Sequence, residues 1–129
     1  MADVNRGKRP LSPFMIGPYY RPQLNSITSI LTRITGNALL IGSLMIVWWL
    51  LAAATSEAYF AVANAVLTSW FGDLVMFGSV WALWYHTLAG VRHMIWDEGK
   101  MLDVESADML SWAIVIGSVI LTIFTAIFV

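Results

Sequence analysis

The stretch MLSWAIVIGSVILTIFTAIFV, Met109–Val129, decides the fold class of this chain. It contains no charged residue, and about 20 apolar residues are enough for a helix to cross a hydrocarbon core of roughly 30 Å. A lone strand would leave its backbone unpaired in lipid, so the spanning state is a helix. Two more apolar stretches of this length precede it. We therefore predict an all-α membrane protein with transmembrane helices at about 30–54, 68–95 and 107–129.

The remaining residues form a single membrane-anchor domain with these helices. The segment 1–24 contains all four prolines of the chain and should be irregular. Only 12% of the 129 residues are charged, about half the proportion of a soluble domain. The net charge of −1 argues against nucleic acid as a partner. The absence of cysteine excludes thiol catalysis, disulfides and cysteine-ligated clusters within this chain, so any protein ligand of a redox centre must be His or Met.

The basic residues predict the orientation of the three helices in the membrane. Five of the seven Lys and Arg residues precede or begin the first span, and the loop between the first two spans has none. Arg92 and Lys100 lie at or after the end of the second span. By the positive-inside rule, the N-terminus and the second loop are cytoplasmic and the C-terminus is periplasmic. Because no signal peptide or Arg-rich transit segment is evident, we expect a bacterial inner membrane.

The second span ends in WYHTLAGVRHMIWDEG, which contains both histidines of the chain. His86 lies about 12 Å inside the predicted boundary, whereas Arg92 and His93 lie at the boundary. His86 and His93 are two helical turns apart on one face, so they cannot occupy the two opposite axial positions of one haem. His86 can supply one axial ligand, and Gly90 would let a flat macrocycle approach the backbone. Alternatively, His86 hydrogen-bonds a Ser or Thr of a neighbouring helix; these residues leave both interpretations open.

The first span begins in NSITSILTRITGN, where Ser29, Arg33 and Asn37 share a helix face. A hydroxyl, a guanidinium and an amide at the membrane edge could bind the carbonyl oxygens of a quinone or a haem propionate. The alternative is that Arg33 reaches the membrane surface as a positively charged anchor while Ser29 caps the helix. On these residues alone, the anchoring interpretation is preferred.

Three motifs resemble the cytochrome b membrane-anchor subunit of succinate dehydrogenase (succinate:quinone oxidoreductase). They are RPLSP (Arg9–Pro13), SILTRITG (Ser29–Gly36) and HTLAGVRHMIWD (His86–Asp97), and the resemblance covers nearly the whole chain. The resemblance implies that His86 is an axial ligand of the haem b iron and that Arg92 and His93 lie on the haem propionate side. It also implies that Ser29 and Arg33 border the quinone site. Two positions depart from the family pattern, because Thr32 and Phe14 stand where histidine is usual.

The resemblance further implies a division of labour between subunits. A flavoprotein subunit would oxidise succinate, and an iron–sulfur subunit would pass the electrons to ubiquinone or another quinone. This chain would anchor both, share haem b with a second small membrane-anchor subunit that supplies the other ligand, and take no catalytic part in succinate oxidation. The alternatives are the anchor of a fumarate reductase, which runs the reverse reaction, and a small non-redox membrane protein.

Overall fold

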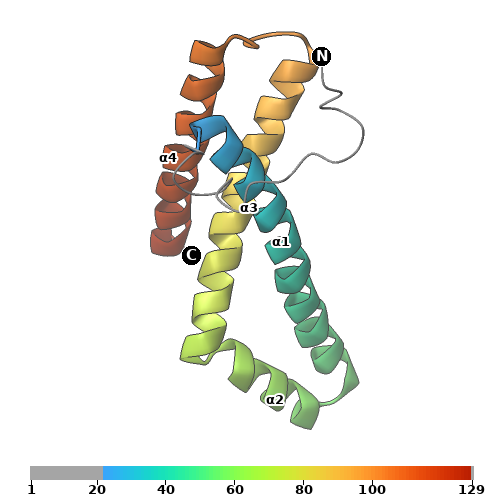
Figure 1. The fold of residues 1–129 in the computed structure, drawn as a ribbon. Coiled ribbons are helices and arrows are strands. Elements are labelled where there is room, and N and C mark those ends of the chain that lie inside the picture. Colours follow the sequence, from blue (N-terminus) through green and yellow to red (C-terminus); the bar gives the residue numbers. More distant parts are fainter. Residues whose placement is uncertain (1–21, 129) are drawn as a thin grey trace, which may run out of the picture.

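The computed structural model describes residues 22–128, which form four helices joined by short connections (Figure 1). They are α1 (Leu24–Thr55), α2 (Glu57–Leu67), α3 (Trp70–Asp97) and α4 (Val104–Phe128). Of these, α1, α3 and α4 are long and apolar enough to cross a membrane. The predicted all-α membrane fold with three long apolar helices is confirmed. The N-terminal motif Arg9–Pro13 and Phe14 lie outside the described residues.

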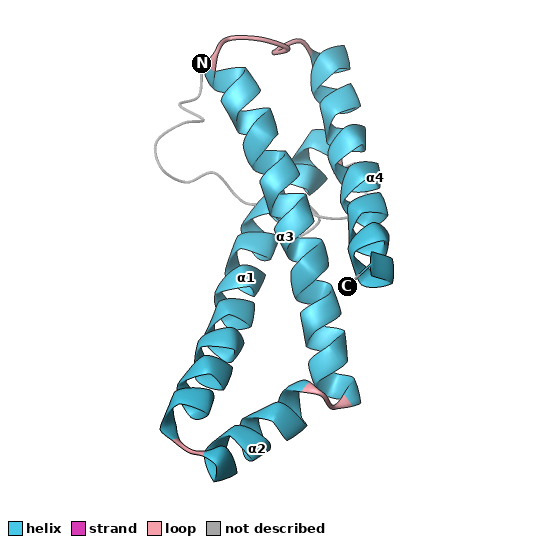
Figure 2. Ribbon diagram, turned by 180° about the vertical axis from the view of Figure 1, so that it is seen from behind, coloured by secondary structure: helices cyan, strands magenta, loops and turns pink. Residues whose placement is uncertain are grey.

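The long helices form an antiparallel bundle that is closed at one end and open at the other. Figures 1 and 2 show α1 crossing α3 near the end where α3 and α4 are joined, and α4 running back along α3. From this crossing α1 and α3 diverge, and α2 bridges the gap between their far ends. The beginning of α1 and the α3–α4 connection therefore share one end of the molecule, as the predicted topology requires.

Helix α2 occupies the connection that the sequence led us to expect as a loop. Ser56 begins it as a cap, because its hydroxyl accepts a hydrogen bond from the N–H of Tyr59 at 3.3 Å. Two indoles of α1 hold α2 in place: Trp48 donates to the Tyr59 hydroxyl at 2.8 Å, and Trp49 donates to Asn64 Oδ1 at 3.2 Å. An eleven-residue apolar helix is too short to span a membrane, so the sequence pattern of the spanning helices did not predict it.

Small and hydroxyl-bearing residues form the faces where the long helices meet. They recur at spacings of three, four or seven, which keeps them on one side of each helix and lets the backbones approach closely. The buried positions on these faces include Thr28, Thr35 and Gly42 of α1, Ala82, Tyr85, Ala89 and Arg92 of α3, and Ala107, Ser111, Ile114, Ser118 and Thr122 of α4. At Gly42 an added Cβ would lie 2.7 Å from the Ser79 hydroxyl oxygen, so α1 and α3 pack closely at this position and a larger residue there would displace the Ser79 side chain.

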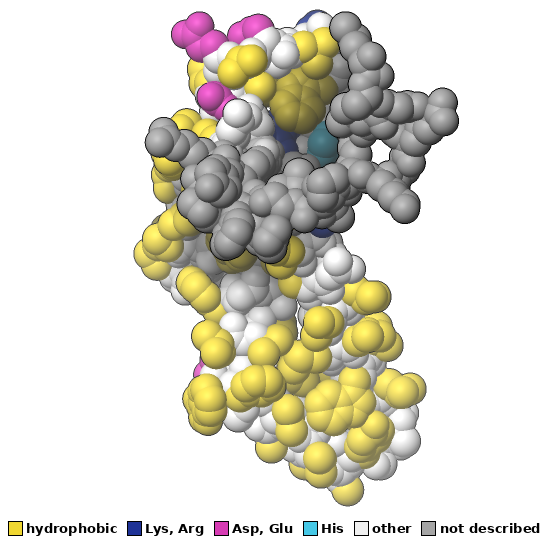
Figure 3. Space-filling view, in the orientation of Figure 1, with side chains coloured by type: hydrophobic (Ala, Val, Ile, Leu, Met, Phe, Trp, Pro, Cys, Tyr) yellow, Lys and Arg dark blue, Asp and Glu magenta, His cyan; other side chains and the backbone are white. Residues whose placement is uncertain are grey.

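The outward faces of the helices are apolar, so their burial in a non-aqueous environment is favourable. Leu40, Ile41 and Leu44 of α1, for example, are each about 60% exposed. Figure 3 shows hydrophobic side chains over the end of the molecule that contains α2, while most of the acidic side chains in view gather where α3 and α4 are joined. Exposed apolar area on this scale indicates contact with lipid or with another membrane subunit.

The polar end of the bundle is formed by the connection between α3 and α4. Helix α3 ends at Asp97, and Gly99 follows its C-cap in the left-handed conformation, φ +73°, where the Gly99 N–H donates to the Trp96 carbonyl at 2.8 Å. Asp103 caps α4 by accepting a hydrogen bond from the N–H of Ser106 at 2.9 Å. Hydrogen bonds from the backbone and hydroxyl of Ser106 hold the pKa of the Asp103 carboxyl below its usual range.

Candidate functional site

The His86 imidazole lies half-buried between α3 and α1. Its Nδ1 is 3.1 Å from the carbonyl oxygen of Thr32 and 3.3 Å from the hydroxyl oxygen of Thr35. The hydrogen bond to a threonine of a neighbouring helix, which the sequence offered as the alternative to a ligand role, is therefore present, and it uses Nδ1 only. For Nε2, no hydrogen-bond partner occurs within residues 22–128.

The Thr32 carbonyl decides which ring nitrogen of His86 carries the proton. A carbonyl oxygen can only accept a hydrogen bond, so Nδ1 must be the donor. In the neutral ring this leaves a lone pair on Nε2, which is the form in which histidine binds a metal while its other nitrogen is fixed by a backbone carbonyl. The site thus presents one oriented imidazole nitrogen that is ready to act as a ligand.

Two glycines leave space around the imidazole. A Cβ added at Gly36 would lie 3.1 Å from His86 Cε1, so a side chain at this position would press on the ring, and glycine lets α1 pass close beside it. A Cβ added at Gly90 would have no neighbour within 4 Å. The open space at Gly90, on nearly the same face as His86, agrees with the sequence argument. Gly36 was missed, although it ends the motif SILTRITG.

Ser29 and Arg33 lie on the exposed side of α1. Helix α1 begins at Leu24 with Gln23 as its N-cap, so Ser29 is inside the helix and the interpretation of Ser29 as a cap is wrong. Neither side chain has a hydrogen-bond or ion-pair partner among the described residues. Asn37, the third member of the predicted face, turns its amide back onto the Arg33 carbonyl at 3.2 Å.

Helix geometry relates this exposed pair to the imidazole. Ser29 and Gly36 are seven residues apart and so point in nearly the same direction, about 10 Å apart along the axis of α1, with Arg33 between them. Because Gly36 lies against the His86 ring, the Ser29–Arg33 side of α1 adjoins the side on which His86 is found.

Arg92 is placed differently from what its position in the sequence suggested. We expected it at the membrane boundary, but it is 2% exposed, at the junction of α1, α3 and α4. Its Nη1 donates to the hydroxyls of Thr28 at 3.0 Å and Ser111 at 2.9 Å, and its Cζ lies 4.7 Å from the centre of the Trp96 ring. Its Nε is buried and has no hydrogen-bond partner within the described part of the chain.

A chain of hydrogen bonds continues from Arg92 to a carboxylate. Ser111 donates to Asn25 Oδ1 at 2.7 Å, and Asn25 Nδ2 donates to Asp108 Oδ1 at 2.7 Å. Tyr85 adds a bond to the Thr28 carbonyl at 3.1 Å. Hydroxyls, an amide and an aromatic face thus surround the guanidinium, and Asp108 balances its charge indirectly. Sequence reasoning missed this cluster, whose signal is a set of polar residues on the inward faces of apolar helices.

His93 is exposed at the same end of the molecule. Helix α3 is continuous from Trp70 to Asp97, so the seven-residue spacing does place His93 and His86 on one side of it. The His93 ring meets Trp96 edge-on, with 5.6 Å between ring centres. The exposed imidazole of His93 therefore lies on the same side of α3 as the half-buried imidazole of His86, two turns further along the helix axis.

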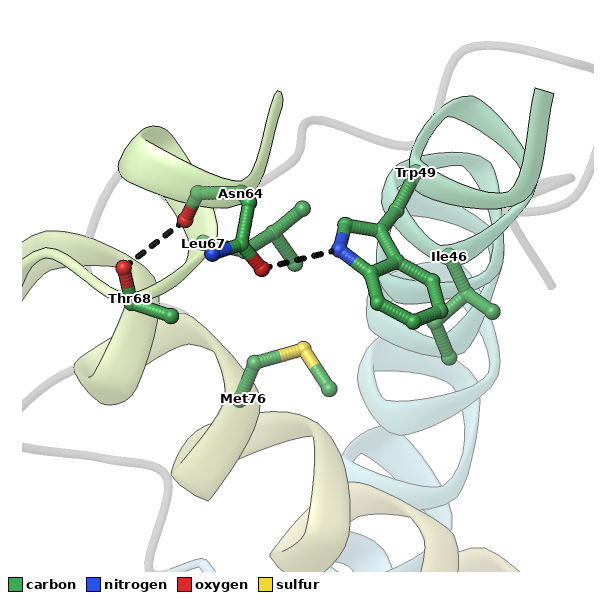
Figure 4. Close-up of a pocket in the computed structure, with 6 residues that line it drawn as sticks. All are labelled: Ile46, Trp49, Asn64, Leu67, Thr68 and Met76. Carbon is green, nitrogen blue, oxygen red and sulfur yellow. Dashed lines mark hydrogen bonds between the residues drawn. The ribbon is translucent and has the colours of Figure 1, made fainter. Parts of the chain in front are cut away.

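A pocket of about 360 Å³ lies elsewhere, in the corner between α1, α2 and α3 (Figure 4). Its lining is apolar except for Asn64 and Thr68, and the Trp49–Asn64 hydrogen bond crosses it. Met76 contributes from α3, ten residues before His86, which is about 15 Å along the helix. This pocket is therefore separate from the site built around His86.

Comparison with known proteins assigns the class to which this fold and site belong. Residues 5–125 match the family described as succinate dehydrogenase/fumarate reductase transmembrane subunit. That match covers most of the chain, and the chain belongs to this family.

Individual relatives narrow the comparison further. The succinate dehydrogenase cytochrome b556 subunit of Paracoccus denitrificans is 54% identical over 98% of this chain and 96% of its own length. The corresponding subunit of Rickettsia conorii is 34% identical over 90% and 89%. The mitochondrial cytochrome b560 subunit of Sus scrofa is 39% identical over 74% of this chain and 57% of its own length. The resemblance to the cytochrome b anchor of succinate dehydrogenase is confirmed.

Proposed function

We propose that this chain is a haem b-binding membrane anchor of succinate dehydrogenase and that His86 Nε2 supplies one axial ligand of the haem iron. The observation that carries the proposal is the state of His86: its Nδ1–H is bound to the Thr32 carbonyl, and its Nε2 has no partner among the described residues. The names of the relatives, which are cytochrome b subunits, support the same assignment.

The residues present fit a haem. The donor is an imidazole with a fixed tautomer that packs on Gly36, and the surface beside it is free of side chains at Gly90. When bound, this group supplies a one-electron redox centre. The chain has only two histidines, and they share a face of α3, so the second axial ligand comes from a second small membrane subunit. The exposed apolar faces of the bundle offer the area against which that subunit can pack.

We assign the haem propionates to the end of the site that carries His93 and Arg92. The His93 imidazole is accessible there. The Nη1 of Arg92 is occupied by Thr28 and Ser111, and its Nε is buried, so neither of these donors is free to reach a propionate directly. At longer range its buried positive charge favours an anionic group at this end of the bundle.

We assign the quinone site to Ser29 and Arg33. Both are exposed on α1 at the polar end of the molecule and are not engaged by other described side chains. Arg33 can donate several hydrogen bonds to a quinone oxygen through its planar guanidinium. Ser29 can donate to a carbonyl oxygen or pass on a proton. Quinone reduction takes up two electrons and two protons, so a site that adjoins both the haem ligand and the cytoplasmic water suits it.

The same end of the molecule is where we place the soluble subunits. The flavoprotein subunit would oxidise succinate to fumarate, and the iron–sulfur subunit would deliver electrons to the quinone at the cytoplasmic surface. This chain contributes anchoring, one haem ligand and one wall of the quinone site.

The test is to purify the complex through a tag on this chain and to record its partner masses and its reduced-minus-oxidised spectrum. We expect flavoprotein, iron–sulfur and second anchor subunits together with haem b. Gly90→Ala should lower the haem content several-fold because its methyl group occupies the open face beside His86. Gly78→Ala is the matched control: it lies on the same helix, also has no neighbour within 4 Å, and gains the same intrinsic helix stability of about 0.5–1 kcal/mol.

Two results of this experiment would contradict the proposal. Equal haem content in the Gly90→Ala and Gly78→Ala complexes would move the cofactor away from this face. A complex without haem b would instead favour a haem-free anchor of the fumarate reductase type.

We place the protein in a bacterial inner membrane with its N-terminus in the cytoplasm. The beginning of α1 and the α3–α4 connection lie at one end of the bundle, so Arg33, Arg92 and Lys100 lie on one side of the membrane. Reporter fusions at Glu57 and after Val129 should both be periplasmic, and a fusion at Lys100 cytoplasmic. A cytoplasmic signal at Glu57 or after Val129 would overturn this topology.

A further inference from the structure

We propose that Thr35 is a positioning residue for His86, which holds the imidazole plane through its hydroxyl and thereby influences the potential of the iron. This inference rests on the proposed function, because it gives Thr35 a role toward the same haem ligand. Thr35 is 1% exposed and lies on the face of α1 that meets α3.

The hydrogen-bond directions around Thr35 can be assigned from its neighbours. Its hydroxyl donates to the Thr32 carbonyl at 3.0 Å, which uses the only hydrogen of that hydroxyl. The contact of 3.3 Å between Thr35 Oγ1 and His86 Nδ1 must therefore be one in which the oxygen accepts. The Nδ1–H of His86 is shared between two acceptors, the Thr32 carbonyl and the Thr35 hydroxyl.

Two acceptors restrict the ring more than one would. A single carbonyl lets the imidazole pivot about one N–H···O line, whereas two acceptors on one N–H favour a single plane. The next residue, Gly36, leaves the room that the Cε1 edge of the ring needs. Thr35 thus orients the His86 ring, and the adjacent Gly36 leaves space for it. The hydroxyl of Thr32 takes no part, since it bonds the Thr28 carbonyl of its own helix at 2.8 Å.

The hydrogen bonds at His86 Nδ1 also affect how basic Nε2 is as a ligand. An N–H that donates to good acceptors makes the opposite ring nitrogen more basic, and a more basic ligand stabilises the oxidised metal. Removing the Thr35 hydroxyl takes away one of the two acceptors. The iron should then be easier to reduce, and its midpoint potential should rise.

The experiment compares Thr35→Val, Thr35→Ser and Thr122→Val in the purified complex. Valine keeps the volume and removes the hydroxyl, whereas serine keeps the hydroxyl. Thr122 is a matched control because it is a buried threonine whose hydroxyl bonds within α4, to the Ser118 carbonyl at 2.7 Å. The readouts are haem content, midpoint potential by redox titration and the low-spin electron paramagnetic resonance signal.

We expect Thr35→Val to raise the potential and shift the low-spin signal, with Thr35→Ser and Thr122→Val close to the parent. Loss of haem in Thr35→Val, while Thr35→Ser and Thr122→Val keep the haem content of the parent, would equally support a role of the Thr35 hydroxyl in holding His86. An unchanged or lower potential in Thr35→Val would overturn the inference, as would matching changes in Thr35→Ser or Thr122→Val. Low-spin haem that survives in His86→Ala would refute His86 as the ligand. Failure of the proposed function can therefore be told apart from failure of the Thr35 inference.

Discussion

In the His86→Ala variant we expect the purified complex to lose the low-spin haem b spectrum of the parent. No other histidine of this chain can take its place, because His93 lies two helical turns away along the same face of α3. The ring is half-buried, hydrogen-bonds α1 through one nitrogen and packs on Gly36, where no side chain depends on it, so its removal should leave the helices assembled. Haem content, reduced-minus-oxidised spectra and subunit composition are the measurements.

His93→Ala is the matched control for this variant. It removes the same side chain from the same helix, at an exposed position whose ring contacts Trp96. We expect it to retain a low-spin spectrum with both axial ligands. A low-spin spectrum of normal intensity in His86→Ala would refute the ligand assignment, and retention of bis-histidine haem by the isolated, monomeric chain would refute the sharing of haem with a second subunit.

Replacing Arg33 with Ala should reduce the rate of quinone reduction at least tenfold, which corresponds to roughly 1.4 kcal/mol of lost transition-state stabilisation. Arg33 is exposed and has no partner among the described side chains, so its loss should not unsettle the bundle. Because Thr32 cannot carry a charge, we expect Arg33 to carry more of the electrostatic load at the proposed quinone site. Succinate oxidation measured with a dye that accepts electrons upstream of quinone should persist.

Two control variants sharpen the Arg33 experiment. Asn37→Ala changes the same exposed side of α1, but the Asn37 amide is turned onto the Arg33 carbonyl, so quinone reduction should stay close to the parent rate. Arg33→Lys keeps the charge and loses the planar fork of donors, so it should recover part of the activity. If dye and quinone activities fell together in Arg33→Ala, Arg33 would be an anchoring or assembly residue.

The three long helices could be predicted, and His86 could be singled out as a candidate, because each rests on a strong local signal. Length and the absence of charge identify a span, and a deep imidazole in a span demands a partner or a function. Helix α2 was missed because its eleven residues are too few to span a membrane, and the sequence was read for spans. The misjudged cap at Ser29 arose because α1 extends to Leu24, and apolar content alone does not locate helix ends.

The burial of Arg92 and the contacts of Gly36 could not be predicted, because both depend on how helices pack. A residue near the end of a span can face water, lipid or a neighbouring helix, and one sequence does not reveal which. The rotation of α3 that turns His86 toward Gly36 also turns Arg92 toward Thr28 and Ser111. Only the relation between α1, α3 and α4 makes these residues neighbours.

The Arg92 cluster has a consequence for the register of the bundle. A slip of α4 by one residue would rotate Ser111 by about 100° and move it 1.5 Å along the axis, away from a cation that water does not reach. Each hydrogen bond lost by such a charged group costs on the order of 1–3 kcal/mol, whereas the apolar contacts of sliding helices are readily exchanged for others. The cluster thus selects one vertical alignment of α1, α3 and α4, and with it the depth at which His86 faces α1.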